Sequence, residues 1–236
     1  MSNKEFIEKY LKETAEISSI IDIKEVEKFI DILFEAWKNE RKVITMGNGG
    51  SASTASHFAG DLSKTVINPS SEKEIVKHKK GFKAMCLNDN AALLTAWIND
   101  CGWEKAYSGA LNTLLDEGDV ILLISVHGGT GWSGNIVEAM KVAKEKNCKI
   151  LGLAGFDGGK MKEMADACIV VPKNSTPHVE GFHGVLQHMI IQKLLELITE
   201  YSQDSVFERL QEMSKKYSDS PIEKDINEIM ETYSDK

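Results

Sequence analysis

The sequence lacks the features of secreted and membrane proteins. None of its apolar runs approaches the roughly 18 residues that a membrane-spanning helix requires. Its opening stretch, MSNKEFIEKYLKE, is charged throughout and contains no apolar signal region. We therefore expect a cytoplasmic protein that does not enter a membrane.

Paired cysteines and clustered positive charge are missing as well. The net charge of −8 at pH 7 argues against nucleic acid as the main partner, because phosphate neutralisation requires clustered Lys and Arg. With 42% hydrophobic and 27% charged residues, the chain has the composition of an ordinary globular protein. The four cysteines show no C-x-x-C spacing and lie in or beside apolar runs, so we expect buried thiols. They are Cys86, Cys101, Cys148 and Cys168.

The segment KVITMGNGGSASTASHFAGD, residues 42–61, is the most informative stretch. A short β-branched run precedes a glycine turn, and a helical pattern begins at Ser51, whose hydroxyl and neighbouring free N–H groups form a potential anion site. His57 and Asp61 are four residues apart, so they share one helix face and can reach a common metal or proton. Two alternatives remain open: a glycine turn without the Lys-Ser/Thr of a P-loop is common, and a His/Asp pair is often only a surface pair.

A second strand and glycine loop follow later in the chain. The run VILLI, residues 120–124, is the strongest strand in the sequence, and SVHGGTGWSG leads from it into a helix over 135–145. Asn88 and Asp89 also follow an apolar run, where open α/β sheets bind ligands.

The remaining pattern alternates strands with helices, which predicts an α/β fold whose parallel sheet is covered on both faces. Residues 68–80 are polar and indicate a loop. A long helix over 176–201 carries Glu180, His183, Gln187 and His188. We expect helices at 4–21, 24–40, 91–97, 104–115 and 161–164, strands at 82–87, 149–153 and 168–171, and two amphipathic tail helices: one with Phe207, Leu210 and Met213, the other with Ile222, Ile226, Ile229 and Met230.

The ordered motifs GNGGSASTASHFAGDL, EGDVILLIS, GLAGFDGGKMKEMADACIVVP and TPHVEGFHGVLQHMI resemble those of the sugar isomerase (SIS) domain family, nearest to its phosphoheptose isomerases. The resemblance covers roughly residues 4–200 and implies a three-layer αβα sandwich with a five-stranded parallel sheet; apolar spacing adds extra helices at both termini. We therefore divide the chain into an SIS domain over 1–203 and a helical extension over 204–236, which lies beyond the usual end of the family. The resemblance also implies a homotetramer with active sites between subunits, which agrees with a first helix that has too little cover within one domain.

The family's metal, usually zinc, is bound by two residues of the first helix after the glycine loop and two of the last helix. Carried over by position, the ligands are His57, Asp61, Glu180 and His188. Asp61 stands for the family's Glu, and Glu180 for its Gln; both changes keep oxygen ligands suited to zinc or another divalent metal. We expect His178 and His183 to be structural or to support the ligands.

The resemblance implies aldose–ketose isomerisation of a phosphorylated sugar through an enediolate, with sedoheptulose 7-phosphate and a manno-heptose 7-phosphate as the expected pair. Because one group cannot readily be a tight ligand and a free base, His188 and Glu180 rank above Asp61 as proton carriers. The family's Ser-Thr-Ser-Gly-Asn-Ser phosphate loop is replaced here, which leaves sugar size open. A non-catalytic sensor or tetrameric scaffold remains the alternative. The expected substrate-binding residues are Asn48, Gly49, Ser51, Asn88, Asp89, Ser125, His127 and Thr130.

Overall fold

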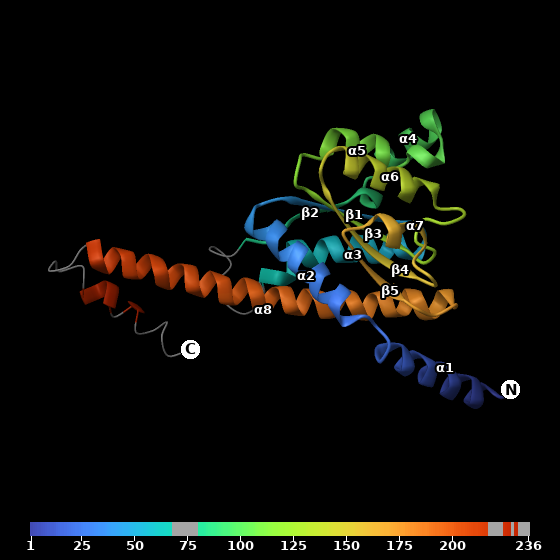
Figure 1. Ribbon diagram of the computed structural model, residues 1–236, viewed down its shortest axis with the longest axis horizontal. Helices are drawn as coiled ribbons and strands as arrows, with labels where there is room; N and C mark the ends of the chain where they lie inside the picture. The colour runs from blue at the N-terminus through green and yellow to red at the C-terminus, as the bar shows by residue number, and fades with distance from the viewer. Residues whose placement is uncertain (68–79, 217–223, 228, 231–236) are drawn as a thin grey trace.

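A computed structural model describes residues 1–67, 80–216, 224–227 and 229–230 of the 236-residue chain. It confirms the α/β fold: five parallel strands in the order β2-β1-β3-β4-β5 lie between two layers of helices (Figure 1). Since every strand points the same way, all their carboxyl ends meet at one edge, where α/β sheets bind ligands. The strands are β1 (Lys42–Gly47), β2 (Lys83–Cys86), β3 (Val120–Ser125), β4 (Lys149–Gly155) and β5 (Ala167–Val171).

The central strand β3 is buried along its whole length, as its uninterrupted apolar sequence predicts for a parallel strand covered on both faces. Val43 of β1 pairs with Ala84 of β2 on one side and with Val120 of β3 on the other. This register places the glycine loop after β1 between the ends of β2 and β3.

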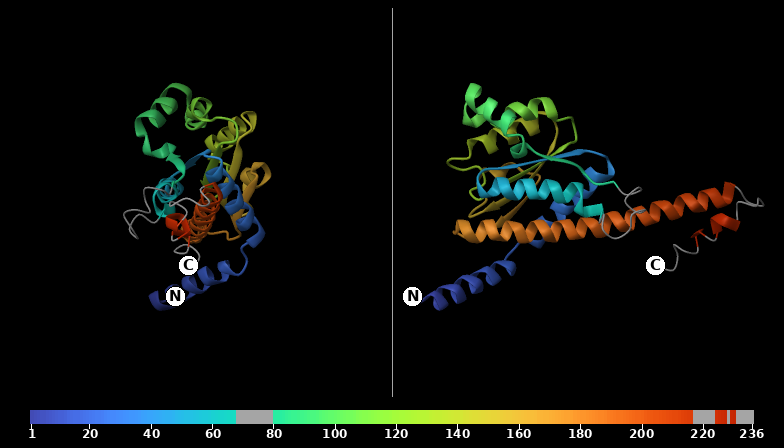
Figure 2. Two further views of the ribbon diagram at one scale, coloured as in Figure 1. Left: turned by 90° about the vertical axis from the view of Figure 1, so that its left-hand side faces the viewer. Right: turned by 180° about the vertical axis from the view of Figure 1, so that it is seen from behind.

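Helices cover both faces of the sheet (Figure 2), and a separate core lies on each face. On one face α2 (Ile23–Lys38), α3 (Gly50–Ser63) and α8 (Thr176–Lys216) bury side chains such as Phe29, Phe58 and Leu186. On the other, α5 (Ser108–Leu114), α6 (Gly134–Glu145) and α7 (Gly159–Met164) bury Leu111 and Met140, and α4 (Ala91–Cys101) lies beyond them. The expected helix over 104–115 is divided into a 3-10 turn at Trp103–Lys105 and α5.

The first helix, α1 (Asn3–Ser18), leaves the body of the molecule in both views. A capping box starts it: Ser2 Oγ accepts from the Glu5 N–H, and Glu5 accepts from the Ser2 N–H. Only Ile17 is buried, whereas Phe6 and Leu11 are exposed. The structure confirms that little of this chain covers the apolar face of α1. That a partner subunit packs on this face stays a prediction.

The last helix is longer than the sequence analysis predicted. We expected an end near Tyr201 and a separate helix with Phe207, Leu210 and Met213, but α8 runs unbroken from Thr176 to Lys216. No Gly or Pro occurs between Tyr201 and Lys216, so nothing in the sequence stops the helix there. The proposed boundary at residue 203 therefore falls inside a continuous helix.

Beyond α8, residues 224–227 and 229–230 are helical and lie beside its far half in both figures. Ile226 is buried, and Ser214 Oγ donates to Asn227 Oδ1 at 3.1 Å. Ile222 and the expected loop at 68–79 lie outside the described residues.

Cys101, expected to be buried, is exposed because it closes α4 at the surface, while Cys86, Cys148 and Cys168 are buried as predicted. Within the part of the chain that the structure describes, no helix is long and apolar enough to cross a bilayer.

Candidate active site

Helices α3 and α8 lie side by side on the same sheet face and bring three potential metal ligands together. Phe58 and Leu62 of α3 and Leu186 and Ile190 of α8 face the core, so the opposite side of each helix faces outward. From that outward side His57, Asp61 and His188 offer ligand atoms that all lie within 4.8 Å of one another. The His57 Nε2 to Asp61 Oδ2 distance is 3.4 Å, and His188 Nδ1 is 3.8 Å from the same oxygen.

The carboxylate of Asp61 is oriented by two neutral donors. Thr65 Oγ1 donates to Asp61 Oδ1 at 2.8 Å, and Gln187 Nε2 donates to Asp61 Oδ2 at 2.9 Å. The Asp61 side chain is 13% exposed, whereas the rings of His57 and His188 are 56% and 61% exposed. Asp61 is thus fixed from behind, while the two imidazoles remain open to a ligand.

This donor set fits a divalent metal. Two imidazole nitrogens and one carboxylate oxygen suit zinc or non-haem iron, and catalytic sites of this kind keep a position open for substrate or water. The hydrogen bond from Gln187 is the type of outer contact that orients a ligating carboxylate. The sequence alone does not predict that Gln187 and Thr65 bind Asp61, because these contacts depend on how the elements that carry them are aligned.

Glu180, the fourth expected ligand, lies outside this group. Its carboxylate faces the start of α3: a methyl group added at Gly50 would lie 2.7 Å from Glu180 Oε1. Eight residues separate it from His188, a rise of about 12 Å along a helix, which explains the separation. The positive end of the α3 dipole favours a carboxylate there.

The glycine loop after β1 is held by a network of amides around Tyr107. Asn48 and Asn135 form a reciprocal pair of 3.0 Å hydrogen bonds, and Tyr107 Oη donates to the carbonyl of Gly47. Asn88 donates to the Gly47 carbonyl at 3.0 Å and accepts from its N–H at 3.2 Å. Burial raises the pKa of Tyr107 to about 12, so its hydroxyl stays a donor.

This network changes the role of two expected substrate-binding residues. The amides of Asn48 and Asn88 are engaged within the loop framework, while Gly49 makes the turn at φ +58° and Ser51 is buried in the first turn of α3. No spacing in the sequence points to Tyr107 or Asn135, because both act through tertiary contacts.

Asp89 lies at the surface in an open hollow of about 550 Å³ between α3 and the β2 edge. On α3 the hollow reaches Gly60, the residue before Asp61, but none of His57, Asp61 and His188 lines it. Its lining consists of Ala59, Gly60, Ser63, Ala84, Met85, Cys86, Asp89, Asn90 and Ala91.

The expected phosphate-binding residues of the second glycine loop lie in two different places. Ser125 is buried and accepts from the Gly129 N–H at 3.4 Å. His127 and Thr130 instead line a separate hollow of about 510 Å³, where the His127 ring lies 4.5 Å from that of Phe156 and 6.1 Å from that of Trp132. Ser51 and Ser125 are both buried and do not line the hollow that His127 and Thr130 line.

The two other histidines of α8 have structural contacts. His183 is buried and donates from Nε2 to the Ala154 carbonyl at 3.0 Å, and burial lowers its pKa to about 4. His178 stacks on Tyr10 of α1 with ring centroids 4.0 Å apart and contacts Ser175 at 2.8 Å.

Comparisons with known proteins agree with this architecture. A family model described as "SIS domain" matches residues 8–155. A phosphoheptose isomerase of Aliarcobacter butzleri is 34% identical over 188 residues, which covers 79% of this chain and 93% of that protein. A second, from Nitratiruptor, is 36% identical over 67% of this chain and 79% of its own length. The solved phosphoheptose isomerase GmhA of Neisseria gonorrhoeae superposes with a TM-score of 0.70 at 26% identity, over 82% of this chain and 98% of that structure.

Proposed function

Because the chain belongs to the SIS domain family and is a sugar-phosphate isomerase, we propose that it is a metal-dependent aldose–ketose isomerase of a phosphorylated heptose. The proposed pair is sedoheptulose 7-phosphate and a manno-heptose 7-phosphate. Relatives named phosphoheptose isomerase, similar over most of both chains, support this choice of substrate.

The observation that carries the proposal is the convergence of His57, Asp61 and His188 from two helices. These three residues would hold a divalent metal, most simply zinc. When bound, such a cation supplies Lewis acidity that polarises the substrate carbonyl.

The protein's own task is to move protons. Converting the aldose to the ketose removes the proton on C2, returns a proton to C1, and transfers the proton of the C2 hydroxyl to the oxygen on C1. Glu180 stands apart from the three-residue cluster, at the start of α3, so its carboxylate is free to carry the carbon-bound proton. His188 faces the Asp61 carboxylate through Nδ1, so Nε2 of its exposed ring remains for the oxygen-bound proton.

Asp61 has a different role in this scheme. Both of its oxygens already accept hydrogen bonds, from Thr65 and Gln187, so it orients the site and is not a free base. Gly49, Ser51 and Asp89 would bind the sugar chain near α3, and His127 and Thr130 the phosphate. Because Asp89 lines one hollow and His127 and Thr130 line another, a homotetramer with active sites between subunits is part of the proposal.

An isomerase assay with a metal dependence tests the proposal. Purified protein is incubated with sedoheptulose 7-phosphate, before and after chelation and after zinc is restored, and aldose formation is followed. We expect turnover that chelation abolishes and zinc restores, and no metal binding by His57→Ala. Turnover that survives complete removal of metal would contradict the metal site, and a lack of turnover by metal-loaded protein would contradict the substrate.

A further inference from the structure

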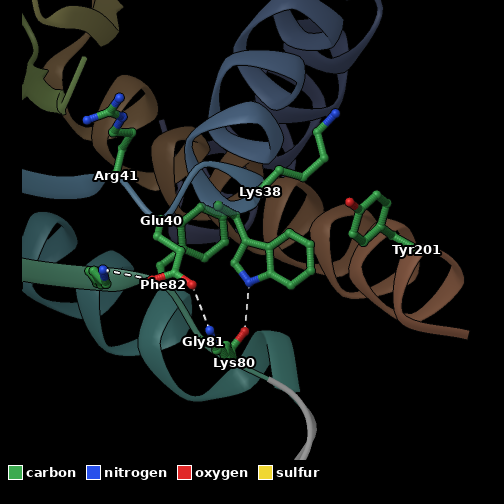
Figure 3. Close-up of a pocket in the computed structure, with 9 residues that line it drawn as sticks. Lys38, Glu40, Arg41, Lys80, Gly81, Phe82 and Tyr201 are labelled. Carbon is green, nitrogen blue, oxygen red and sulfur yellow. Dashed lines mark hydrogen bonds and ion pairs between the residues drawn. The ribbon is translucent and has the colours of Figure 1, made fainter. Parts of the chain in front are cut away.

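A third pocket lies at the opposite edge of the sheet from the strands' carboxyl ends. Its residues come from the end of α2, the turn before β1, the residues before β2, and α8 (Figure 3). The cavity measures about 270 Å³. We call it the basic pocket; it is lined by Trp37, Lys38, Glu40, Arg41, Lys80, Gly81, Phe82, Lys83 and Tyr201.

Positive charge exceeds negative charge in this pocket, although the chain as a whole carries −8. The ammonium groups of Lys80 and Lys83 both contact Glu40, at 2.6 and 3.1 Å, and these contacts lower the pKa of Glu40 to about 2. One carboxylate thus faces two lysines. Arg41 donates from Nη1 to the carbonyl of Glu117 at 3.1 Å and forms no ion pair with any described residue. Lys38 forms an ion pair with Glu35, so it does not add to the excess of positive charge in the pocket.

A backbone turn at the end of α2 places Glu40 beside the lysines of the pocket. Two backbone hydrogen bonds cap the C-terminus of helix α2: the Glu40 N–H donates to the Trp37 carbonyl, and the Arg41 N–H donates to the Ala36 carbonyl. This cap places Glu40 at φ +54°, a position usually taken by glycine. Here the residue in the left-handed conformation is Glu40, and its carboxylate contacts both Lys80 and Lys83. Figure 3 shows the contact between Glu40 and Lys80.

Two aromatic rings form a corner beside the charged groups. The rings of Trp37 and Tyr201 lie 5.7 Å apart at 86°, and Phe34 stacks behind Trp37 at 5.8 Å and 10°. The Trp37 indole N–H donates to the Lys80 carbonyl at 2.7 Å, which fixes the ring. A planar ligand can stack on one face of such a corner and meet the edge of the other ring.

We propose that the basic pocket binds a phosphorylated ligand that carries a planar ring, of the mononucleotide class. Arg41, Lys80 and Lys83 contact the phosphate, and Trp37 and Tyr201 hold the ring. The volume lies just below the roughly 300–1,000 Å³ of small-molecule sites, which favours a mononucleotide over a dinucleotide.

The basic pocket is distinct from the candidate active site. Tyr201 lies 13 residues after His188 on the same helix, a rise of about 20 Å. The proposal does not rest on the proposed isomerase activity, since it concerns other residues and a different ligand.

Titration calorimetry on the full chain tests the proposal with AMP, adenosine and inorganic phosphate. We expect saturable binding of AMP, and binding at least about tenfold weaker for adenosine and for phosphate alone. Arg41→Gln keeps a donor for the Glu117 carbonyl but removes the charge, and Tyr201→Leu removes the ring; each weakens AMP binding about tenfold. Lys105→Gln, at an exposed lysine paired with Glu138 beside α6, is the matched control and leaves AMP binding unchanged.

Three outcomes overturn the proposal. The first is no saturable AMP binding at concentrations up to about 5 mM. The second is inorganic phosphate that binds as tightly as AMP, which would remove the ring from the ligand. The third is AMP binding that is lost in His127→Gln but kept in Arg41→Gln, which would place the nucleotide in the candidate active site.

Discussion

At the scale of single residues, the carboxyl groups of Asp61 and Glu180 stand in different surroundings. Asp61 accepts from Thr65 and Gln187 and lies within the cluster of potential ligands. Glu180 faces the first turn of α3, near the bend of the glycine loop. A carboxylate held in a fixed hydrogen-bonded geometry suits metal ligation, and one outside the ligand set suits proton transfer.

Glu180→Gln separates the two roles of this residue. If Glu180 carries the proton, the amide cannot replace it, and kcat falls by about 10²–10⁴-fold with metal content unchanged. If Glu180 is instead a fourth ligand, the amide oxygen can still coordinate, as the family's glutamine does by resemblance. Kinetics and elemental analysis on the same preparation decide between these roles, and retention of full activity would refute the proton-carrier assignment.

His183 couples stability to pH. Burial lowers its pKa to about 4 from 6.5, so the folded protein keeps a neutral ring while the unfolded chain takes up a proton as pH falls below 6.5. The stabilisation is complete above pH 6.5 and is lost as pH falls toward 4, by up to about 3 kcal/mol.

His183→Gln tests this coupling, because its amide can still donate to the Ala154 carbonyl but does not titrate. Urea unfolding of wild type and variant between pH 4 and 7.5 should show a steeper loss of stability on the acid side for wild type. Parallel stability curves for the two proteins would show that His183 is not the source.

At the scale of elements, the pairing of α3 with α8 creates the site. Spacing alone predicts that His57 and Asp61 share a face, and it predicts both helices. It cannot predict that Gln187 reaches Asp61, because that contact depends on the alignment of two helices more than 100 residues apart in sequence. The absence of Gly and Pro between Tyr201 and Lys216 predicts the full length of α8. The expected break near Tyr201 came from treating the apolar residues after it as a separate amphipathic helix.

Gln187→Met tests the link between the two helices. Methionine keeps the side-chain length but removes the donor to Asp61, so we expect metal affinity to fall about 10–100-fold. Gln192→Met, at an exposed position of the same helix, is the matched control and should bind metal like wild type. Equal metal affinity in both variants would mean that the Gln187 contact does not tune the site.

At the scale of the whole molecule, the parallel sheet and its two helical layers follow from the alternation of apolar runs and amphipathic segments. The distribution of substrate-binding residues does not: Asn48 and Asn88 brace the glycine loop, and Asp89 and His127 line separate hollows. A sequence motif specifies a loop, whereas the direction of each side chain depends on neighbours such as Tyr107.

The exposed apolar face of α1 predicts an oligomer. Four chains of 26.2 kDa give about 105 kDa, which light scattering at micromolar concentration should detect. The double change Phe6→Glu and Leu11→Glu places charge on the exposed face and should lower the mass, whereas Lys12→Gln on the same helix should not. A wild-type protein that scatters as a single chain would contradict the tetramer.

The most direct test of the isomerase account follows solvent deuterium by NMR during conversion of sedoheptulose 7-phosphate in D₂O. Proton transfer through an enediolate predicts deuterium at C1 of the ketose or C2 of the aldose with metal-loaded wild type. The same account predicts neither conversion nor labelling with His57→Ala. Conversion by the wild type without any deuterium entering the sugar would contradict it, since the hydrogen would then have moved without passing through an exchangeable group on the protein.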